Sequence, residues 1–183
     1  MFNKIKNESL REHIQKIADS CPQYYKEIPS SLTGKYHPPD ETQEGGLLRH
    51  IRRCLVFAEE ASRMYNLDDF GYDVLCSACI LHDIYKTGLE KSDKTDSLHP
   101  VHIFDKIEEY INDNELDSEI KKYLYYIQFA CLFHEGRWSH DDVGNILFNL
   151  KPNQRAVYYG TVMHIIDYFA SRRSISECFK EGF

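Results

Sequence analysis

The sequence lacks any long hydrophobic run. No stretch of its 183 residues approaches the ~18–20 apolar residues that a membrane-spanning helix needs. The lysines near Met1 are not followed by an apolar segment, so no secretory signal is visible. Hydrophobic residues still make up 42% of the chain and charged residues 28%, a balance that supports a folded core. These features predict a soluble, cytoplasmic protein that does not bind membranes.

Basic residues are fewer than acidic residues. The chain has 22 Lys and Arg against 29 Asp and Glu, a formal net charge of −7. A protein that binds duplex DNA needs a basic surface, so this balance disfavours that class. A small anionic substrate held by a few local cations remains compatible with it.

The six cysteines lack the spacing of a zinc site made of thiolates alone. Only Cys76 and Cys79 form a C-x-x-C pair, and no second pair completes such a site. Both lie in an apolar helical run, where we expect small core residues. The scattered cysteines favour reduced thiols in a cytosolic chain.

Strand-like alternation of apolar and polar residues is nearly absent, and apolar positions instead recur at helical spacing. The pattern predicts an all-α bundle of about six to eight helices. The expected helices cover residues 8–19 (capped by Asn7 or Ser9), 46–65, 69–83, 100–111, 118–134 and 153–172, with short pieces between and after them. We predict one domain: an N-terminal helix and irregular lead-in (1–43), a core (44–172) and a tail (173–183).

Histidine and aspartate interrupt the apolar stripes of four predicted helices. The interruptions are His50, His82 with the adjacent Asp83, His134 and Asp167. A single inward histidine is usually a hydrogen-bonded core residue, but an unpaired buried carboxylate carries a large energetic penalty. Three histidines and two aspartates share one simple partner, a divalent transition-metal ion such as Mn, Fe, Co, Ni or Zn.

These residues belong to a series of motifs with a recognisable order. The motifs are Gly45-Gly46-Leu47-Leu48-Arg49-His50, Ile80-Leu81-His82-Asp83-Ile84-Tyr85-Lys86, His99-Pro100, His134-Glu135-Gly136 and His164-Ile165-Ile166-Asp167. Over roughly residues 35–172 the series resembles the HD-domain metal-dependent phosphohydrolase superfamily. Its motif style is similar to small stand-alone HD proteins and HD-type 3′–5′ exoribonucleases, and the Gly-Tyr-Pro signature of cyclic dinucleotide phosphodiesterases is absent. The resemblance implies a compact HD-domain helical bundle.

The resemblance also implies a metal site. Its minimal ligands would be His50, His82, Asp83 and Asp167. Binuclear relatives add two histidines, and in them the aspartate at the position of Asp83 bridges two ions. We therefore expect two divalent ions.

Three histidines are candidates for the two added ligands: His99, His102 and His134. His99 begins an inward-facing stripe that continues through Ile103, whereas His102 shares a face with Lys106. We predict that His99 and His134 are ligands, and that His102 is exposed or supports a ligand.

Lys86 is the expected catalytic partner of Asp83, because the lysine of similar HD-x-x-K motifs contacts the phosphate or the nucleophile. The alternative is a solvated lysine at a helix end. Other candidates for substrate binding are Arg49, His37 in a proline-rich loop, and the pair Arg137 and Trp138, which could stack on a base. The alternatives are a structural turn for the His37 loop and a packed loop anchor for Arg137 and Trp138. His164 is expected to orient Asp167, with a buried core histidine as the alternative.

Together these features predict a metal-dependent phosphohydrolase that acts on a phosphoester of a nucleotide, cyclic nucleotide or short oligonucleotide. Its partner would be a small phosphorylated substrate or short single-stranded nucleic acid. Two alternatives remain open: a catalytically weak HD module that senses a nucleotide or binds a protein, and an HD-type di-iron oxygenase. The sequence also leaves open the metal, the oligomeric state and the choice between mono- and diesterase.

Overall fold

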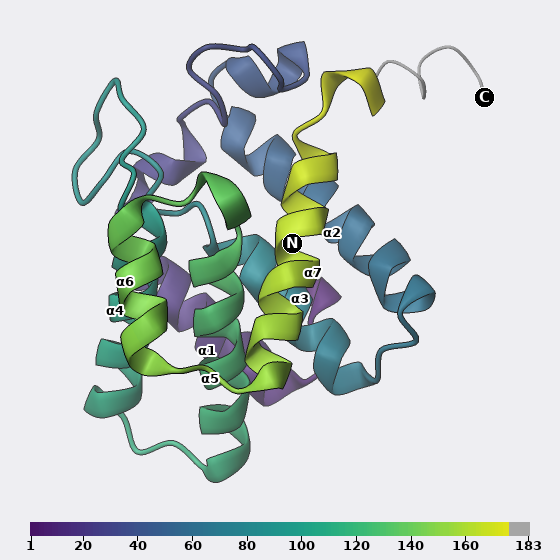
Figure 1. The fold of residues 1–183 in the computed structure, drawn as a ribbon, viewed down its shortest axis with the longest axis vertical. Helices are drawn as coiled ribbons and strands as arrows, with labels where there is room; N and C mark the ends of the chain where they lie inside the picture. The colour runs from purple at the N-terminus through teal and green to yellow at the C-terminus, as the bar shows by residue number, and fades with distance from the viewer. Residues whose placement is uncertain (176–183) are drawn as a thin grey trace.

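The computed structural model describes residues 1–175, and every regular element within this range is helical (Figure 1). Its α-helices are α1 (Glu8–Ser20), α2 (Gly46–Met64), α3 (Asp69–Leu81), α4 (His99–Asp113), α5 (Ser118–Phe133), α6 (Asp141–Leu150) and α7 (Gln154–Ala170). Short 3₁₀ turns cover Phe2–Lys4, Gln23–Lys26, Pro39–Thr42 and Gly136–Trp138. The predicted all-α bundle of six to eight helices is confirmed.

Side-chain caps explain where four helices begin. The carboxamide of Asn7 accepts a hydrogen bond from the amide of Leu10, and Asn153 caps α7 in the same way. Asp68 and Asp117 do this for α3 and α5. Such caps satisfy amide groups that have no partner inside the helix, so these short polar residues fix the start of each helix.

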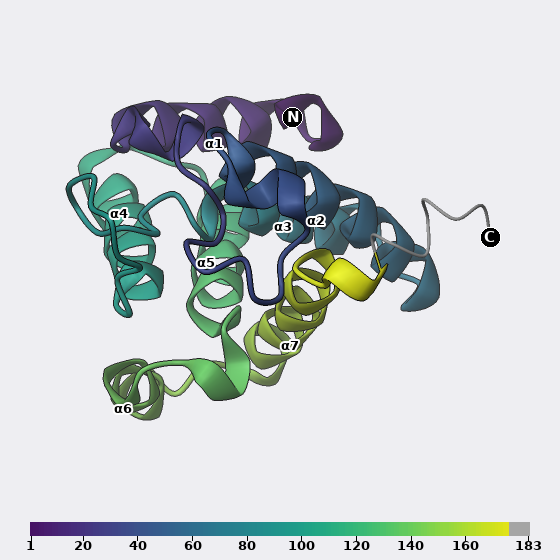
Figure 2. The same cartoon turned by 90° about the horizontal axis from the view of Figure 1, so that it is seen from above.

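The core lies around α3 and α5. Every residue of α3 from Gly71 to Leu81 is buried, and so is every residue of α5 from Tyr126 to Leu132. Helix α5 packs against α7, α4 and α3, and α2 packs against α3 and α7 (Figures 1 and 2). Helix α1 lies along one side of the bundle, whereas α6 lies at its periphery. Helices α3 and α5 therefore form the centre of the bundle.

The segment between α1 and α2 is irregular, as predicted, and it is tied to the start of α2. The amide of Gly45 donates to the carbonyl of Glu27, and the amide of Ser30 donates to that of Glu41. Gly46 has no room for a side chain, since a Cβ there would lie 2.1 Å from the Glu41 carbonyl oxygen. The glycine therefore lets the backbone at Glu41 pack directly on α2.

Two details differ from the sequence-based expectation. Helix α3 ends at Leu81 rather than at Asp83, so His82 caps the helix and Asp83 lies in the turn that follows. Helix α6 was not among the expected long helices. Most of the predicted tail, including Cys178, lies outside the described residues. None of the helices found in residues 1–175 combines the length and apolar character of a membrane span.

Candidate metal centre

Six polar side chains predicted as ligands come from five separate parts of the bundle. His50 lies in the second turn of α2, His82 and Asp83 follow α3, His99 begins α4, His134 follows α5, and Asp167 lies in the last turn of α7. All except Asp167 are almost completely buried, and the Asp167 side chain is 23% exposed. The fold thus gathers polar groups from distant parts of the chain inside its core.

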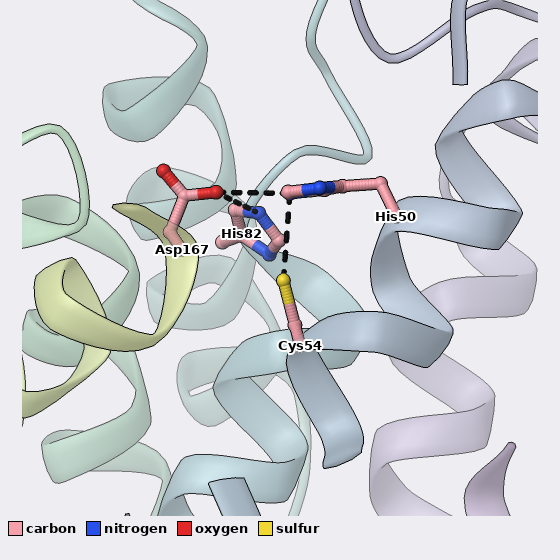
Figure 3. A group of neighbouring side chains, drawn as sticks. All are labelled: His50, Cys54, His82 and Asp167. Atoms are coloured by element: carbon pink, nitrogen blue, oxygen red, sulfur yellow. Dashed lines mark hydrogen bonds and ion pairs between the residues drawn. The ribbon is translucent and has the colours of Figure 1, made fainter. Parts of the chain in front are cut away.

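The first group of side chains contains His50, His82 and Asp167 (Figure 3). The Asp167 Oδ1 atom lies 2.9 Å from His50 Nε2 and 3.7 Å from His82 Nε2. The Sγ atom of Cys54, one turn after His50, lies 3.4 Å from His50 Nε2. The potential ligand atoms of all four residues lie within 4.8 Å of one another.

The second group contains Asp83, His99 and His134. The Asp83 Oδ1 atom lies 3.0 Å from His99 Nε2 and 3.4 Å from His134 Nε2, and the two nitrogens are 3.1 Å apart. Two atoms each about 2.1 Å from one ion lie about 3.0 Å apart at a right angle and about 3.4 Å apart at the tetrahedral angle. The spacing of this group therefore matches the spacing of ligands around a single transition-metal ion.

Asp83 connects the two groups. While its Oδ1 atom faces His99 and His134, its Oδ2 atom lies 3.5 Å from His82 Nε2 in the first group. The Lys86 ammonium contacts the same Oδ2 atom. The Asp83 carboxylate thus lies between the two groups, with the Lys86 ammonium and His82 at its Oδ2 atom.

Three of the histidines have their ring orientation fixed in the same way. Nδ1 of His82, His99 and His134 lies 3.0, 2.6 and 2.6 Å, respectively, from the backbone carbonyl oxygen three residues earlier. A carbonyl only accepts hydrogen bonds, so each Nδ1 carries the proton. Each Nε2 atom then presents a lone pair to the centre in the neutral ring, which is the form that binds a metal.

Three buried polar atoms at this centre have no hydrogen-bond partner. One is His50 Nδ1, beside Glu41, and the other two, His82 Nε2 and Asp83 Oδ1, face the ligand groups. Buried polar atoms are nearly always satisfied, so unsatisfied ones here call for a ligand. The last two atoms are potential metal ligands and lie among other potential ligands. The donor set, its spacing and these two atoms all fit divalent transition-metal ions.

The electrostatics keep both aspartates charged. Burial alone would raise the pKa of Asp83, but Lys86 and His82 hold it well below its usual range. Burial also opposes ionisation of Asp167, and contacts with His50 and His82 hold the pKa of Asp167 well below the usual range. Burial lowers the pKa of His82, which favours the neutral ring. The carboxylates and this imidazole are therefore in metal-binding forms near neutral pH.

Glu41 supports the centre from the irregular segment, and the sequence analysis did not identify it. Its side chain is fully buried, and its Oε2 atom lies 2.7 Å from His37 Nδ1 and 3.4 Å from His50 Nδ1. Arg53 forms an ion pair with the same carboxylate. The Glu41 carboxylate thus lies next to His50 Nδ1, at a longer distance than the carbonyl groups that hold the other histidines. The only signal in the sequence was the closeness of Glu41 to Gly45-Gly46.

A cavity of about 540 Å³ opens beside the centre. Asp167 and Lys86 form part of its wall, so it reaches the potential metal ligands. The remaining lining residues are Tyr36, His37, Glu135, Arg137, Trp138, His164, Tyr168, Ser171 and Arg172. A volume of this size is typical of small-molecule sites.

The structure places four of the five predicted substrate-binding residues in the wall of the cavity. Lys86, His37, Arg137 and Trp138 all line the cavity. Arg49 does not, because its guanidinium donates to backbone carbonyls of residues 40, 43 and 44.

The two predicted supporting histidines make separate contacts. His102 lies outside the ligand groups, with its Nε2 atom 2.9 Å from Asp96 Oδ2. His164 does not bond Asp167, and its Nδ1 atom instead lies 2.7 Å from the carbonyl oxygen of His134. Its ring also packs against Gly136, where a Cβ would clash with it. His164 therefore packs against and stabilises the turn that carries His134.

No protein-family model, no curated protein and no solved structure matches this chain. The interpretation of the centre therefore depends on its own geometry and chemistry.

Proposed function

We propose that this protein is a metal-dependent phosphohydrolase of the HD type, and that it acts on a phosphoester of nucleotide origin. The observation that carries the proposal is the arrangement around Asp83. Its two oxygens face two groups of histidines, and three of those rings have Nδ1 held by a carbonyl and Nε2 directed inward. Two divalent ions held by these residues would lower the pKa of a bound water towards neutrality and neutralise phosphate oxygens.

The protein groups at the centre suit a phosphate ester. Lys86 contacts Asp83 and also lines the cavity, which places an ammonium at the boundary between the ligands and the substrate space. A lysine ammonium is a mobile point charge that suits a phosphate oxygen. Because charge builds on these oxygens during hydrolysis, Lys86 would stabilise the transition state more than the bound substrate.

The aromatic part of the cavity wall supports a nucleotide as the substrate. Trp138 and Tyr168 lie parallel, with ring centroids 5.8 Å apart and 5° between their planes. The Arg172 guanidinium lies 4.0 Å from the Tyr168 ring centroid, and Arg137 lies 4.6 Å from that of Trp138. Aromatic rings and guanidinium planes are the surfaces on which bases stack. A phosphate at Lys86 and a flat base at this wall would both fit a cavity of about 540 Å³.

A hydrolysis screen tests the proposal. Metal-stripped protein is reloaded separately with Mn²⁺, Fe²⁺, Co²⁺, Ni²⁺ or Zn²⁺. Each form is then incubated with p-nitrophenyl phosphate, bis-p-nitrophenyl phosphate, nucleoside mono- and triphosphates, cyclic nucleotides and a short single-stranded oligonucleotide. We expect metal-dependent release of phosphate or nucleotide from at least one nucleotide-derived ester.

Two variants provide matched controls for the screen. Asp83→Asn should abolish hydrolysis, whereas Asp93→Asn, in an exposed loop, should leave it unchanged. Absence of hydrolysis by every metal-loaded form, or equal hydrolysis by Asp83→Asn, would overturn the proposal.

A further inference from the structure

Cys54 belongs to the first ligand group, although its sequence position suggested a core residue. It lies on α2 one turn after His50, and its side chain is fully buried. Its Sγ atom is 3.4 Å from His50 Nε2 and within 4.8 Å of a ligand atom of His82 and of Asp167 (Figure 3). Three side chains with potential metal ligands therefore surround this thiol.

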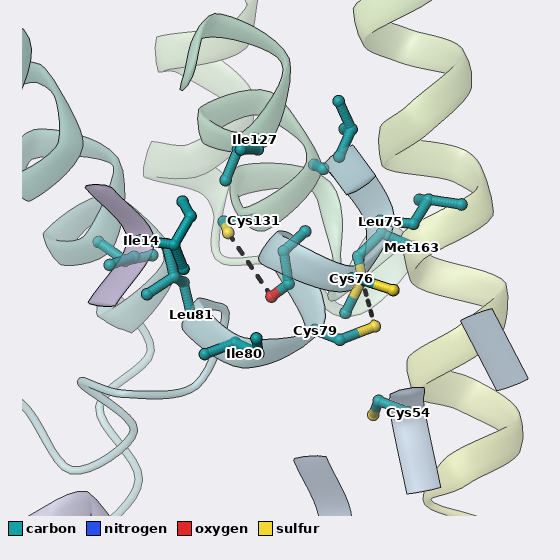
Figure 4. Packing of buried hydrophobic residues seen from close by; sticks show 14 of the residues in the cluster. Ile14, Cys54, Leu75, Cys76, Cys79, Ile80, Leu81, Ile127, Cys131 and Met163 are labelled. Carbon is teal, nitrogen blue, oxygen red and sulfur yellow. Dashed lines mark hydrogen bonds between the residues drawn. The ribbon is translucent and has the colours of Figure 1, made fainter. Parts of the chain in front are cut away.

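The other buried thiols described by the structure have different surroundings (Figure 4). Cys79 directs its Sγ atom to Met163 Sδ at 3.8 Å, and Cys131 directs its Sγ atom to the carbonyl oxygen of Ala78 at 3.9 Å. Within residues 1–175, Cys54 is the one cysteine in a group of potential metal ligands. Cys54 packs in the same buried cluster as these cysteines, and what distinguishes it is the contact of its thiol with the first ligand group.

A second observation shows that this group contains an unsatisfied potential ligand atom. His82 Nε2 is buried, has no hydrogen-bond partner, and has its lone pair directed into the group because Nδ1 lies 3.0 Å from the Cys79 carbonyl oxygen. A zinc ion has sulfur at about 2.3 Å and imidazole nitrogen at about 2.0 Å, so these atoms lie about 3.5 Å apart at the tetrahedral angle. The observed distance of 3.4 Å between Cys54 and His50 matches this value.

We propose that Cys54 is a thiolate ligand of the ion held by His50, His82 and Asp167, and that this position takes zinc. The inference rests on the metal centre of the proposed function. Thiolate and imidazole together select zinc among the divalent ions, whereas a group without sulfur accepts harder ions as well. Binding forms the Zn–S bond, breaks the S–H bond, and releases the Cys54 proton to solvent.

The proposal makes the two metal positions chemically different. The group of Asp83, His99 and His134 contains no sulfur and offers three protein ligands. The group with Cys54 offers four protein ligands, so it would hold its ion with one more ligand than the other group. Cys54 does not line the cavity, whereas Asp167 does, so the thiolate would hold its ion from the buried side.

Cobalt spectroscopy tests the inference, because a thiolate bound to Co²⁺ gives a charge-transfer band in the near ultraviolet that nitrogen and oxygen ligands do not give. The probe is Co²⁺ alone, added to metal-stripped full-length protein. We expect the band in wild type and in Cys76→Ser, a buried cysteine of α3 outside the ligand groups. The band should be lost in both Cys54→Ser and Cys54→Ala. A band that persists in Cys54→Ala, or is absent from wild type, would overturn the inference.

X-ray absorption of the zinc-loaded wild-type protein provides a test that needs no variant. We expect a sulfur neighbour at about 2.3 Å in the shell of the first equivalent of zinc bound. A shell of nitrogen and oxygen alone would overturn the inference. The outcomes also separate this inference from the proposed function. A sulfur ligand without phosphoester hydrolysis supports Cys54 and refutes the function, whereas hydrolysis without a sulfur ligand does the reverse.

Discussion

The Nε2 atoms of His99 and His134 lie 3.1 Å apart, and both face the carboxylate of Asp83. Since each ring has its Nδ1 proton on a backbone carbonyl, two neutral rings would direct lone pairs at each other. A proton on one ring or a shared cation relieves this repulsion. Burial opposes a charge on His134, but Asp83 raises its pKa, as expected where a proton takes the place of a metal ion. The arrangement therefore favours the binding of a cation.

Removal of metal should destabilise the protein. Ions held by the two ligand groups would cross-link α2, α4, α7 and the turns after α3 and α5, so their loss would remove binding energy from the folded state only. Each site loaded at 100 times its dissociation constant contributes about 2.7 kcal/mol. We expect a chelator to lower the thermal midpoint by several degrees, measured by circular dichroism. An unchanged midpoint, after elemental analysis has shown metal loss, would contradict the account.

His99→Ala and His102→Ala should differ in metal content. His99 lies in the second ligand group, whereas His102 binds Asp96 outside it. We expect His99→Ala to lose about one equivalent of metal, measured by elemental mass spectrometry. His102→Ala should retain the wild-type content and change stability by about 1 kcal/mol or less. The reverse result would show that the second ligand group has been misassigned.

Lys86→Ala should impair the catalytic step more than folding. Its ammonium contacts Asp83 at the edge of the cavity, and its side chain is only 16% exposed. Loss of this charge should lower kcat by about two to three decades, or ~2–4 kcal/mol, with a smaller change in KM. Lys94→Ala, in an exposed loop, is the matched control and should keep the wild-type rate. A Lys86→Ala rate within threefold of wild type would leave the lysine without a catalytic role.

Glu41→Gln should flatten the acid side of the stability profile of the metal-free protein. Burial alone would raise the pKa of Glu41, but contacts with His37, His50 and Arg53 lower it from 4.5 to about 2. Because the folded-state pKa is depressed, the stability that Glu41 contributes is present above pH 4.5 and is lost as the pH falls towards 2.

The linkage predicts a loss of about 2 kcal/mol of unfolding free energy from Glu41 between pH 6 and pH 3, measured by urea unfolding. This part of the slope should be absent from Glu41→Gln and retained by Glu44→Gln, where the residue is exposed. Equal slopes for wild type and Glu41→Gln would contradict the role of Glu41.

The helices could be predicted from the sequence because apolar periodicity and the capping residues are local signals. The caps at Asn7 and Asp68 show this, since each begins a helix close to where the pattern predicts it. The predicted end of α3 was two residues too late, because the apolar pattern does not show that the helix ends before the polar pair His82 and Asp83. Helix α6 has one fully buried residue, Val143, so its periodicity was weak.

The candidate site could be predicted where its residues interrupt an apolar stripe of a helix. The inward stripe of α4 separated His99, now found in a ligand group, from His102. Cys54 was missed because a cysteine on an apolar stripe has the same pattern as a core residue. Glu41 was missed because its role depends on contacts of an irregular segment, and Arg49 is next to His50 in sequence yet turns to backbone carbonyls.

Anomalous X-ray diffraction from crystals of the protein loaded with zinc or manganese tests the central claim most directly. The account predicts two peaks on opposite sides of the Asp83 carboxylate. One peak should lie among His50, His82 and Asp167, and the other should contact His99 and His134. Metal-loaded crystals with no peak at these residues, or with a single peak away from Asp83, would contradict the account.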